Sequence, residues 1–173
     1  MPFEPFIVTA ELPPEVLAWA DDLRRTHYPP ERNHLAAHVT LFHALAPSLL
    51  DELWRVLARQ AAERAAPTVR ITGLMSLGRG TAIALESPQM LAIRAEIAER
   101  FHGALTAQDA HPPRLHITIQ NKVTPAAARD LQQELAPQIA PRSFAFPALG
   151  LHLYCGPHWE AAGRWPFRGK QDG

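Results

Sequence analysis

Two short stretches of the chain carry the same pair of residues that can do acid/base chemistry. The sequence HVTL at positions 38–41 and the sequence HITI at positions 116–119 each place a histidine and a threonine two positions apart in an apolar run. A β-strand points residues i and i+2 to the same face. Each stretch therefore predicts an imidazole beside a hydroxyl on one face of a strand, with two aliphatic side chains facing the core.

These residue types suit chemistry on a phosphate. Histidine has an unperturbed pKa near 6.5, so an imidazole can give or take a proton near neutral pH. A threonine hydroxyl can donate to a non-bridging phosphate oxygen and stabilise charge that develops there. If the two strands converge, we expect His38 and His116 to be the acid/base catalysts and Thr40 and Thr118 to bind the phosphate. The near symmetry leaves open which histidine is the acid and which the base.

The elements around the two stretches occur twice in the same order. The pattern predicts a strand at 6–11, a helix at 14–25, the first H-x-T strand, a helix from Ser48 to about 64 and a strand at 68–77. It then predicts a strand at 81–86, a helix capped by Ser87 to about 105, the second H-x-T strand, a helix capped by Thr124 to about 135 and a strand at 142–154. We expect residues 157–167 to form a closing strand and residues 168–173 a polar tail.

Corresponding residues of the two halves lie at nearly constant offsets. The offsets are 75, 78 and 77 residues for Glu11 and Glu86, His38 and His116, and Gly73 and Gly150. A shared period indicates duplication. We therefore expect one domain over 1–173 with two pseudo-symmetric lobes, about 1–78 and 79–167. The predicted fold is α+β, in which duplicated β-α-β-α-β halves form two antiparallel sheets around a central cleft with helices outside.

Composition limits the classes of partner. The chain has 173 residues, 47% of them hydrophobic, with 17 Lys+Arg against 17 Asp+Glu. This is the composition of a globular protein without a global field that would attract nucleic acid or membrane, so we expect any RNA contact to be small and local. The single cysteine, Cys155, excludes an internal disulfide and fits a reducing compartment. No secretory or membrane-spanning pattern is found, and we expect a cytoplasmic monomer.

The paired H-x-T-hydrophobic stretches, about 78 residues apart in a duplicated chain, resemble those of the 2H phosphoesterase superfamily. Within it, residues 31–43 and 116–123 are similar to bacterial proteins of the 2′-5′ RNA ligase family, and the likeness runs from the first strand to the closing hairpin. The resemblance implies a site without metal or cofactor, in which both histidines and both threonines surround a phosphate, typically a 2′,3′-cyclic phosphodiester at an RNA end. Ligation by a 5′-hydroxyl is the same chemistry in reverse. The implied partner is an RNA terminus or a small nucleotide with a cyclic phosphate.

Four further residues are candidates for substrate contact. Gln120 and Lys122 lie at even spacing from His116, which predicts that they share its strand face and reach ribose, base or phosphate. Phe42 follows Thr40 on the first face and could stack on a base, although an aromatic residue in a strand more often packs in the core. Tyr154 is a candidate at the rim, together with Arg32 and Arg79.

The remaining histidines leave other interpretations open. His34, His38 and His43 have spacings that a zinc site can use, but no carboxylate lies near His38 or His116 on either strand. Odd spacing places His43 on the opposite face from His38, where we expect a structural or supporting role. His152 and His158 could line the cleft, and Trp159 and Trp165 are expected to have a packing role. The alternatives to a metal-free phosphoesterase are a non-catalytic nucleotide or RNA-end binding module and a zinc hydrolase.

Overall fold

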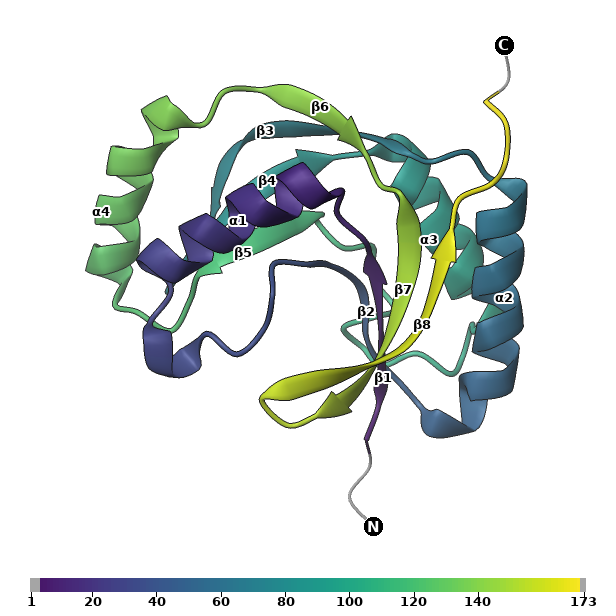
Figure 1. The fold of residues 1–173 in the computed structure, drawn as a ribbon. Helices are drawn as coiled ribbons and strands as arrows, with labels where there is room; N and C mark the ends of the chain where they lie inside the picture. The colour runs from purple at the N-terminus through teal and green to yellow at the C-terminus, as the bar shows by residue number, and fades with distance from the viewer. Residues whose placement is uncertain (1–3, 172–173) are drawn as a thin grey trace.

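A computed structural model describes residues 4–171, in which helices are interspersed among the strands (Figure 1). The strands are β1 (Phe6–Ala10), β2 (Val39–Leu45), β3 (Thr68–Ser76), β4 (Thr81–Glu86), β5 (His116–Gln120), β6 (Arg142–Ala145), β7 (Ala148–Cys155) and β8 (His158–Pro166). The helices are α1 (Pro14–His27), α2 (Leu50–Glu63), α3 (Pro88–Arg100) and α4 (Pro125–Leu135). Short 3₁₀ turns cover Pro30–Arg32, Pro47–Leu49 and Ala136–Gln138.

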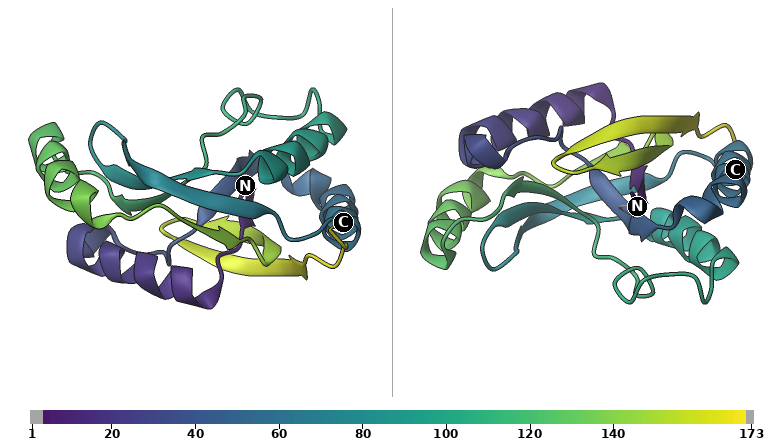
Figure 2. Two further views of the ribbon diagram at one scale, coloured as in Figure 1. Left: turned by 90° about the horizontal axis from the view of Figure 1, so that it is seen from above. Right: turned by 90° about the horizontal axis from the view of Figure 1, so that it is seen from below.

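The strands form two four-stranded sheets, with the orders β2-β1-β7-β8 and β5-β4-β3-β6. Every strand pairing within them is antiparallel. The helices lie outside the sheets, with α1 and α4 at one end of the molecule and α2 and α3 at the other (Figures 1 and 2). The predicted α+β fold with two antiparallel sheets and external helices is confirmed.

The two halves of the sequence exchange a strand. β3 belongs to the first half of the sequence but pairs with β4 in the second sheet. β7 belongs to the second half but pairs with β1 in the first sheet. Helix α1 crosses over in the same way, because it packs against β5 of the second sheet. Neither sheet is therefore built from one continuous half of the chain.

Two of the three serine and threonine residues that were predicted to cap helices do so. The side chains of Ser87 and Thr124 accept hydrogen bonds from Met90 N and Ala127 N, which confirms both predicted caps. Ser48 does not cap α2, because it lies inside the Pro47–Leu49 turn and the helix begins after Leu49. Helix α3 ends at Arg100, not near 105, since the chain turns there and reaches Gly103 at φ +86°.

The predicted strand at 142–154 is two strands. β6 pairs with β3 of the second sheet, whereas β7 pairs with β1 of the first. The break falls at Phe146-Pro147, where the proline has no N–H to offer a sheet ladder. The chain therefore changes sheets at the residue that could not have continued the strand.

Alternate residues of the H-x-T strands enter the hydrophobic core. Val39, Leu41, Ile117 and Ile119 are all fully buried, as the apolar alternation predicts. They belong to one apolar cluster that includes residues of both sheets and of all four described helices. Burying a side chain of this kind contributes about 1.5–3 kcal/mol, so these four aliphatic residues fix the position of both strands.

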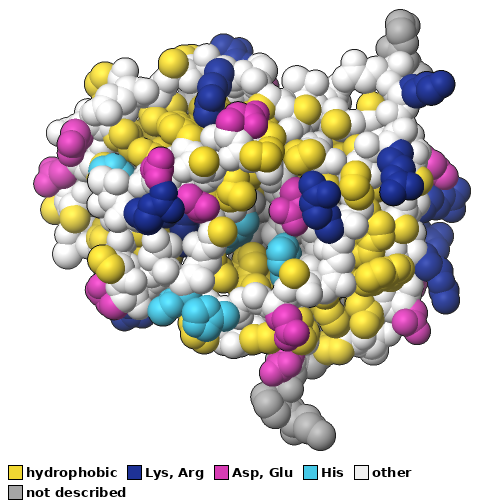
Figure 3. Space-filling view, viewed as in Figure 1, with side chains coloured by type: hydrophobic (Ala, Val, Ile, Leu, Met, Phe, Trp, Pro, Cys, Tyr) yellow, Lys and Arg dark blue, Asp and Glu magenta, His cyan; other side chains and the backbone are white. Residues whose placement is uncertain are grey.

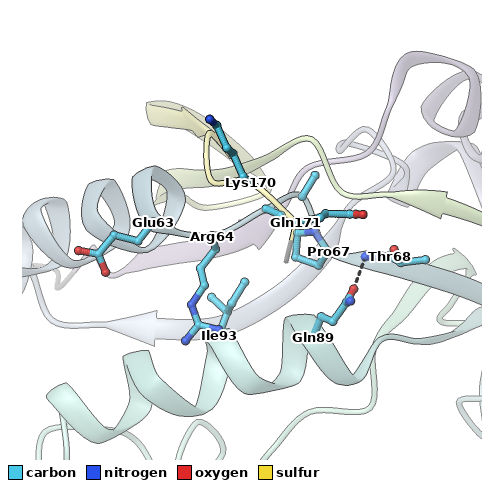
Figure 4. Close-up of a pocket in the computed structure, with 10 residues that line it drawn as sticks. Glu63, Arg64, Pro67, Thr68, Gln89, Ile93, Lys170 and Gln171 are labelled. Carbon is cyan, nitrogen blue, oxygen red and sulfur yellow. Dashed lines mark hydrogen bonds between the residues drawn. The ribbon is translucent and has the colours of Figure 1, made fainter. Parts of the chain in front are cut away.

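The predicted polar tail at 168–173 packs against helix α2 as far as it is described, and residues 172–173 lie outside the described part. The backbone N–H of Arg168 donates to Ala61 O at 2.8 Å, and that of Gly169 donates to Arg64 O at 2.9 Å. Beside these contacts lies a cavity of about 460 Å³ between the end of α2 and the start of α3 (Figure 4). Its lining contains no histidine, so it is unsuited to proton transfer near neutral pH.

Candidate active site

The two H-x-T strands face each other across the gap between the sheets. β2 is the outer strand of the first sheet and β5 is the outer strand of the second. Residue pairs of these two strands have Cα atoms within 8 Å of each other. The space-filling view shows histidine side chains gathered around a hollow near the middle of one face (Figure 3). The structure thus brings together the two stretches that the sequence places 78 residues apart.

His38 and His116 make the same hydrogen bond. Nδ1 of His38 lies 2.8 Å from Ala36 O, and Nδ1 of His116 lies 2.6 Å from Arg114 O. A carbonyl oxygen can only accept, so both Nδ1 atoms carry the proton. In the neutral ring, Nε2 is then the atom with the free lone pair, and in the charged ring it is the atom that can give up a proton. Each histidine is therefore oriented to exchange a proton through Nε2.

The surroundings of His38 favour the neutral imidazole. Burial lowers its pKa to about 4, and the charges of Arg24, His152 and His116 act in the same direction against the opposing effect of the Ala36 carbonyl. The ring of Trp159 lies over it, with ring centroids 4.6 Å apart. At pH 7 the ring of His38 is thus neutral, and its Nε2 is free to accept a proton. The influence of His116 on this pKa shows that the two imidazoles are electrostatically close.

A buried arginine connects helix α1 to strand β5 and to the loop that precedes β2. Arg24 is 3% exposed, and its Nη1 donates to Thr118 O at 2.8 Å while its Nε donates to Asn33 Oδ1 at 3.1 Å. Burial lowers the pKa of Arg24. Sequence reasoning missed this residue. The signal was present, because Arg24 follows Val16 and Ala20 at spacings of four on the buried face of the helix.

Both H-x-T strands contain a β-bulge directly after the threonine. Thr9 pairs with Thr40 but Val8 pairs with Phe42, which leaves Leu41 as the extra residue. In β5 the corresponding extra residue is Ile119, between the paired residues Thr118 and Gln120. A bulge shifts the alternation by one, so side chains beyond it point to the opposite face from the one that simple spacing predicts.

The bulges correct two of the predicted substrate contacts. Phe42 is fully buried with the guanidinium of Arg94 4.1 Å from its ring centroid, so it belongs to the core and not to the cleft. Gln120 is 6% exposed, and its Oε1 accepts a hydrogen bond from Thr81 Oγ1 at 2.9 Å. The same shift turns His43 outward, away from the face of Val39 and Leu41 on which its spacing had placed it.

A cavity of about 420 Å³ adjoins the His38 side of the site. Two of the predicted contact residues, Lys122 and Tyr154, line it, together with Arg32. Lys122 lies beyond the end of β5 and has a φ of +61°. The direction of its side chain is therefore set by the turn and not by strand alternation. Arg79 is placed elsewhere and donates from Nε to Val123 O at 3.1 Å.

Aromatic side chains form much of the wall of this cavity. Tyr28 and Trp159 line it beside Tyr154, whose side chain is exposed. Trp159 was expected to have a packing role, and the rings against which it packs are those of His38 and His152, with centroids at 4.6 and 5.7 Å, beside the cavity. The closing hairpin brings it there because Trp159 pairs with Tyr154 across β7 and β8. The sequence carries no signal for this position beyond the aromatic residue itself.

Carboxylates reach the neighbourhood from elements other than β2 and β5. Glu11, just after β1, has Oε1 3.7 Å from Nε2 of His152, which also contacts Thr9 Oγ1 at 3.1 Å. A second carboxylate, Asp109, contacts His43. Between residues 4 and 171, no group of three or more His, Cys, Asp or Glu side chains lies close enough to hold a metal ion. No helix in that range is long and apolar enough to cross a membrane.

One comparison with known proteins identifies a family, and another identifies a shared fold. A model of the 2′-5′ RNA ligase superfamily matches residues 12–156. No curated protein sequence matches the chain. The solved structure of TT0787 of Thermus thermophilus is similar with a TM-score of 0.66 and 16% identity, covering 96% of this chain and 100% of that one.

E. coli LigT is similar to the same extent. Its complex with NADP+ has a TM-score of 0.63 and 17% identity over 96% of this chain and 99% of that chain. Its complex with 3′-AMP has a TM-score of 0.59 and 18% identity over the same shares. At these identities the solved structures establish a common fold, and the family model accounts for most of the sequence.

Proposed function

Because the chain belongs to the 2′-5′ RNA ligase superfamily, we propose that it is a metal-independent phosphoesterase acting on 2′,3′-cyclic phosphates or 2′-5′ phosphodiester bonds of RNA ends or nucleotides. The observation that carries the proposal is the matched pair of imidazoles. His38 and His116 both bind a backbone carbonyl through Nδ1, which leaves both Nε2 atoms for proton exchange on a phosphate between them. Two such groups on opposite sides of phosphorus suit in-line displacement.

The proposed reaction assigns one proton transfer to each histidine. Nε2 of His38, neutral because of its lowered pKa, takes a proton from water as the water oxygen bonds to phosphorus. The bond from phosphorus to one ribose oxygen breaks, and that oxygen takes a proton from Nε2 of His116. Thr40 and Thr118 donate to the non-bridging oxygens as their charge increases. Ligation reverses these steps with a 5′-hydroxyl in place of water.

The cavity beside His38 supports a nucleoside as the group attached to the phosphate. Its volume of about 420 Å³ lies within the roughly 300–1,000 Å³ typical of small-molecule sites. Tyr154 and Trp159 offer aromatic faces on which a base can stack, and Lys122 offers a cation for phosphate. Among similar structures, E. coli LigT has been crystallised with 3′-AMP and with ATP. These features favour a nucleotide or RNA end as the substrate.

The test is turnover of adenosine 2′,3′-cyclic phosphate in the presence of a chelator. We expect hydrolysis that the chelator does not affect. Replacing His38 or His116 with Ala should lower kcat by about 10²–10⁴-fold, the range for one general acid or base. His102→Ala, a change at an exposed histidine away from both H-x-T stretches, should leave kcat unchanged. Circular dichroism would confirm that the variants remain folded.

The same assay distinguishes the alternatives. Tight binding of the nucleotide without turnover would indicate a non-catalytic binding module. Loss of turnover with chelator would indicate a metal hydrolase. Full activity of both His38→Ala and His116→Ala would show that the acid/base assignment is wrong.

A further inference from the structure

A second cavity, of about 260 Å³, lies on the other side of the H-x-T pair from the first. It shares Thr40 and His116 with the proposed catalytic site, and its other polar walls come from outside the two motifs. These are His43, Gln108, Asp109, His111 and Arg114, together with the buried Arg94. The proposed mechanism gives none of them a role.

The chain direction places the two cavities at opposite ends of the site. Before β2, His34 lines the first cavity, and further along the strand His43 lines the second. The second H-x-T stretch runs the other way, from Arg114 at the second cavity to Lys122 at the first. A molecule whose phosphate lies between His38 and His116 can therefore extend into both cavities.

Asp109 holds the ring of His43 in one orientation. The side chain of Asp109 is 1% exposed, and Oδ1 lies 3.1 Å from Nδ1 of His43. Its oxygens also accept from the backbone N–H of His43 at 2.8 Å and of Ala44 at 2.9 Å. Because the carboxylate accepts at Nδ1, Nε2 of His43 is the nitrogen left for another partner. The ring itself is 41% exposed.

The charges in this cavity favour an anion. Burial raises the pKa of Asp109, but the hydrogen bonds from His43 and Ala44 outweigh it and hold the pKa below its ordinary value. The resulting carboxylate is turned away from solvent and is already occupied by donors. Arg94, which donates from Nε to Leu41 O at 3.1 Å, is 3% exposed and balances that charge. What remains at the surface are imidazoles, the amide of Gln108 and the exposed Arg114. The guanidinium and the amide donate to an anion, and each imidazole does so as the imidazolium.

The size of the cavity favours a compact group over a second nucleoside. A volume of about 260 Å³ is below the roughly 300–1,000 Å³ of sites that hold drug-sized molecules. It is adequate for a compact group such as a phosphate. Imidazolium and guanidinium N–H groups make charge-assisted hydrogen bonds to phosphate oxygens.

Resting on the proposed function, we infer that this cavity binds a second phosphate of the substrate, the one on the 5′ oxygen of the ribose whose 2′,3′-cyclic phosphate is opened. The base is attached to C1′ and the 5′ group to C4′, on either side of the 2′,3′ edge. A ribose held by that edge between His38 and His116 directs the base toward Tyr154 and Trp159 and the 5′-phosphate toward His43 and Arg114. The substrate class is then a 5′-phosphorylated nucleotide or an RNA end, whose last linkage supplies that phosphate.

The inference is tested by comparing adenosine 2′,3′-cyclic phosphate with the same molecule carrying a 5′-phosphate. We expect the 5′-phosphate to raise kcat/KM about tenfold or more, because it adds charge-assisted hydrogen bonds to the bound substrate. In His43→Gln and Arg114→Gln the ratio between the two substrates should fall toward 1. In the control variant His102→Gln the ratio should stay at the wild-type value. Because both kcat/KM values are measured with the same variant, their ratio cancels any general effect of the substitution on catalysis or folding.

The inference would be overturned if the ratio of the two kcat/KM values were near 1 in the wild type, or if it stayed unchanged in both His43→Gln and Arg114→Gln. Neither result would contradict the proposed phosphoesterase activity. If neither substrate is turned over, the proposed function fails instead. The second phosphate is then tested by calorimetric binding of adenosine 3′-phosphate and adenosine 3′,5′-bisphosphate. Tighter binding of the bisphosphate by wild type but not by His43→Gln supports the subsite, and equal binding overturns it.

Discussion

The two histidines differ in their surroundings although they make matching hydrogen bonds. Burial under Trp159 lowers the pKa of His38 to about 4, whereas both Nδ1 atoms bind a carbonyl in the same way. The sequence symmetry that left the acid and base roles open is thus broken by residues outside the motifs. Trp159, which comes from the closing hairpin, is the clearest case.

In the proposed reaction, this burial predicts how the activity depends on pH. A general base acts only when unprotonated, so activity is lost as the pH falls through its pKa. With His38 at about 4 instead of 6.5, the acid limb of kcat/KM should lie near pH 4. Trp159→Ala exposes the ring to water and should move that limb upward toward pH 6.5. The measurement is kcat/KM for adenosine 2′,3′-cyclic phosphate from pH 3.5 to 8.

Trp54→Ala is the matched control, because Trp54 is exposed and contacts Trp165 at a distance from the histidines. It should leave the acid limb in place. Two results would contradict the prediction. One is an acid limb near pH 6.5 in the wild-type protein, and the other is an acid limb that Trp159→Ala does not shift.

At the scale of elements, the bulges after Thr40 and Thr118 determine which residues reach the cleft. Gly80, just before β4, packs against the second of them: a Cβ added there would lie 2.2 Å from Gln120 O and 2.8 Å from Asn121 Cα. Both atoms belong to the backbone, so the contact can be relieved only if β4 and β5 move apart. Glycine at this position therefore allows the close approach of the strand that carries His116 and Thr118.

Gly80→Ala should lower the free energy of unfolding by about 1–3 kcal/mol, the usual cost of overpacking, and should also lower kcat by displacing β5. Urea denaturation and steady-state kinetics measure the two effects. Gly103→Ala is the comparison, because Gly103 has a positive φ of +86° but open space around it. That variant should lose roughly 1–2 kcal/mol from the backbone conformation alone and keep its kcat. Equal kcat values for the two variants would show that the packing of β5 against Gly80 does not affect catalysis.

The sequence predicted the elements well because their signals are local. Apolar alternation placed Val39 and Ile117 in the core, and Ser87 and Thr124 were recognised as caps from the residues that follow them. The bulges and the exchange of β3 and β7 depend on pairing between distant strands, which one strand's own pattern does not contain. For that reason Gln120 was expected in the cleft and Phe42 was kept as a possible stacking residue, whereas the positions of Arg24 and Trp159 and the contact between His43 and Asp109 were not foreseen.

At the scale of the molecule, the strand exchange makes the two halves dependent on each other. The first sheet joins β1 and β2 to β7 and β8, and the second joins β3 to β4. One apolar cluster runs through both sheets. The site between β2 and β5 is therefore positioned by the whole domain, and its two cavities are the outer ends of one interface between sheets.

The overall charge limits how much RNA such a site can engage. The 17 basic residues are balanced by 17 acidic ones, and the cations that line the two cavities and are not buried are Arg32, Lys122 and Arg114. For single strands, the logarithm of affinity falls with the logarithm of salt with a slope of about −0.7 per phosphate contacted. Three cations thus predict a slope of roughly −2 for an RNA oligonucleotide ending in a 2′,3′-cyclic phosphate.

A longer RNA should gain nothing beyond the nucleotides that these cations reach. We expect kcat/KM for a 20-residue RNA and for a dinucleotide with the same cyclic end to agree within about threefold, and Lys122→Gln to reduce the salt slope by about 0.7. Lys170→Gln, a change at a lysine beside the distant cavity of Figure 4, should leave the slope unchanged. A slope steeper than about −4, or a tenfold preference for the long RNA, would require a basic surface beyond the two cavities. With the expected result, the protein acts on the terminal nucleotides alone, as the small separate cavities on either side of His38 and His116 imply.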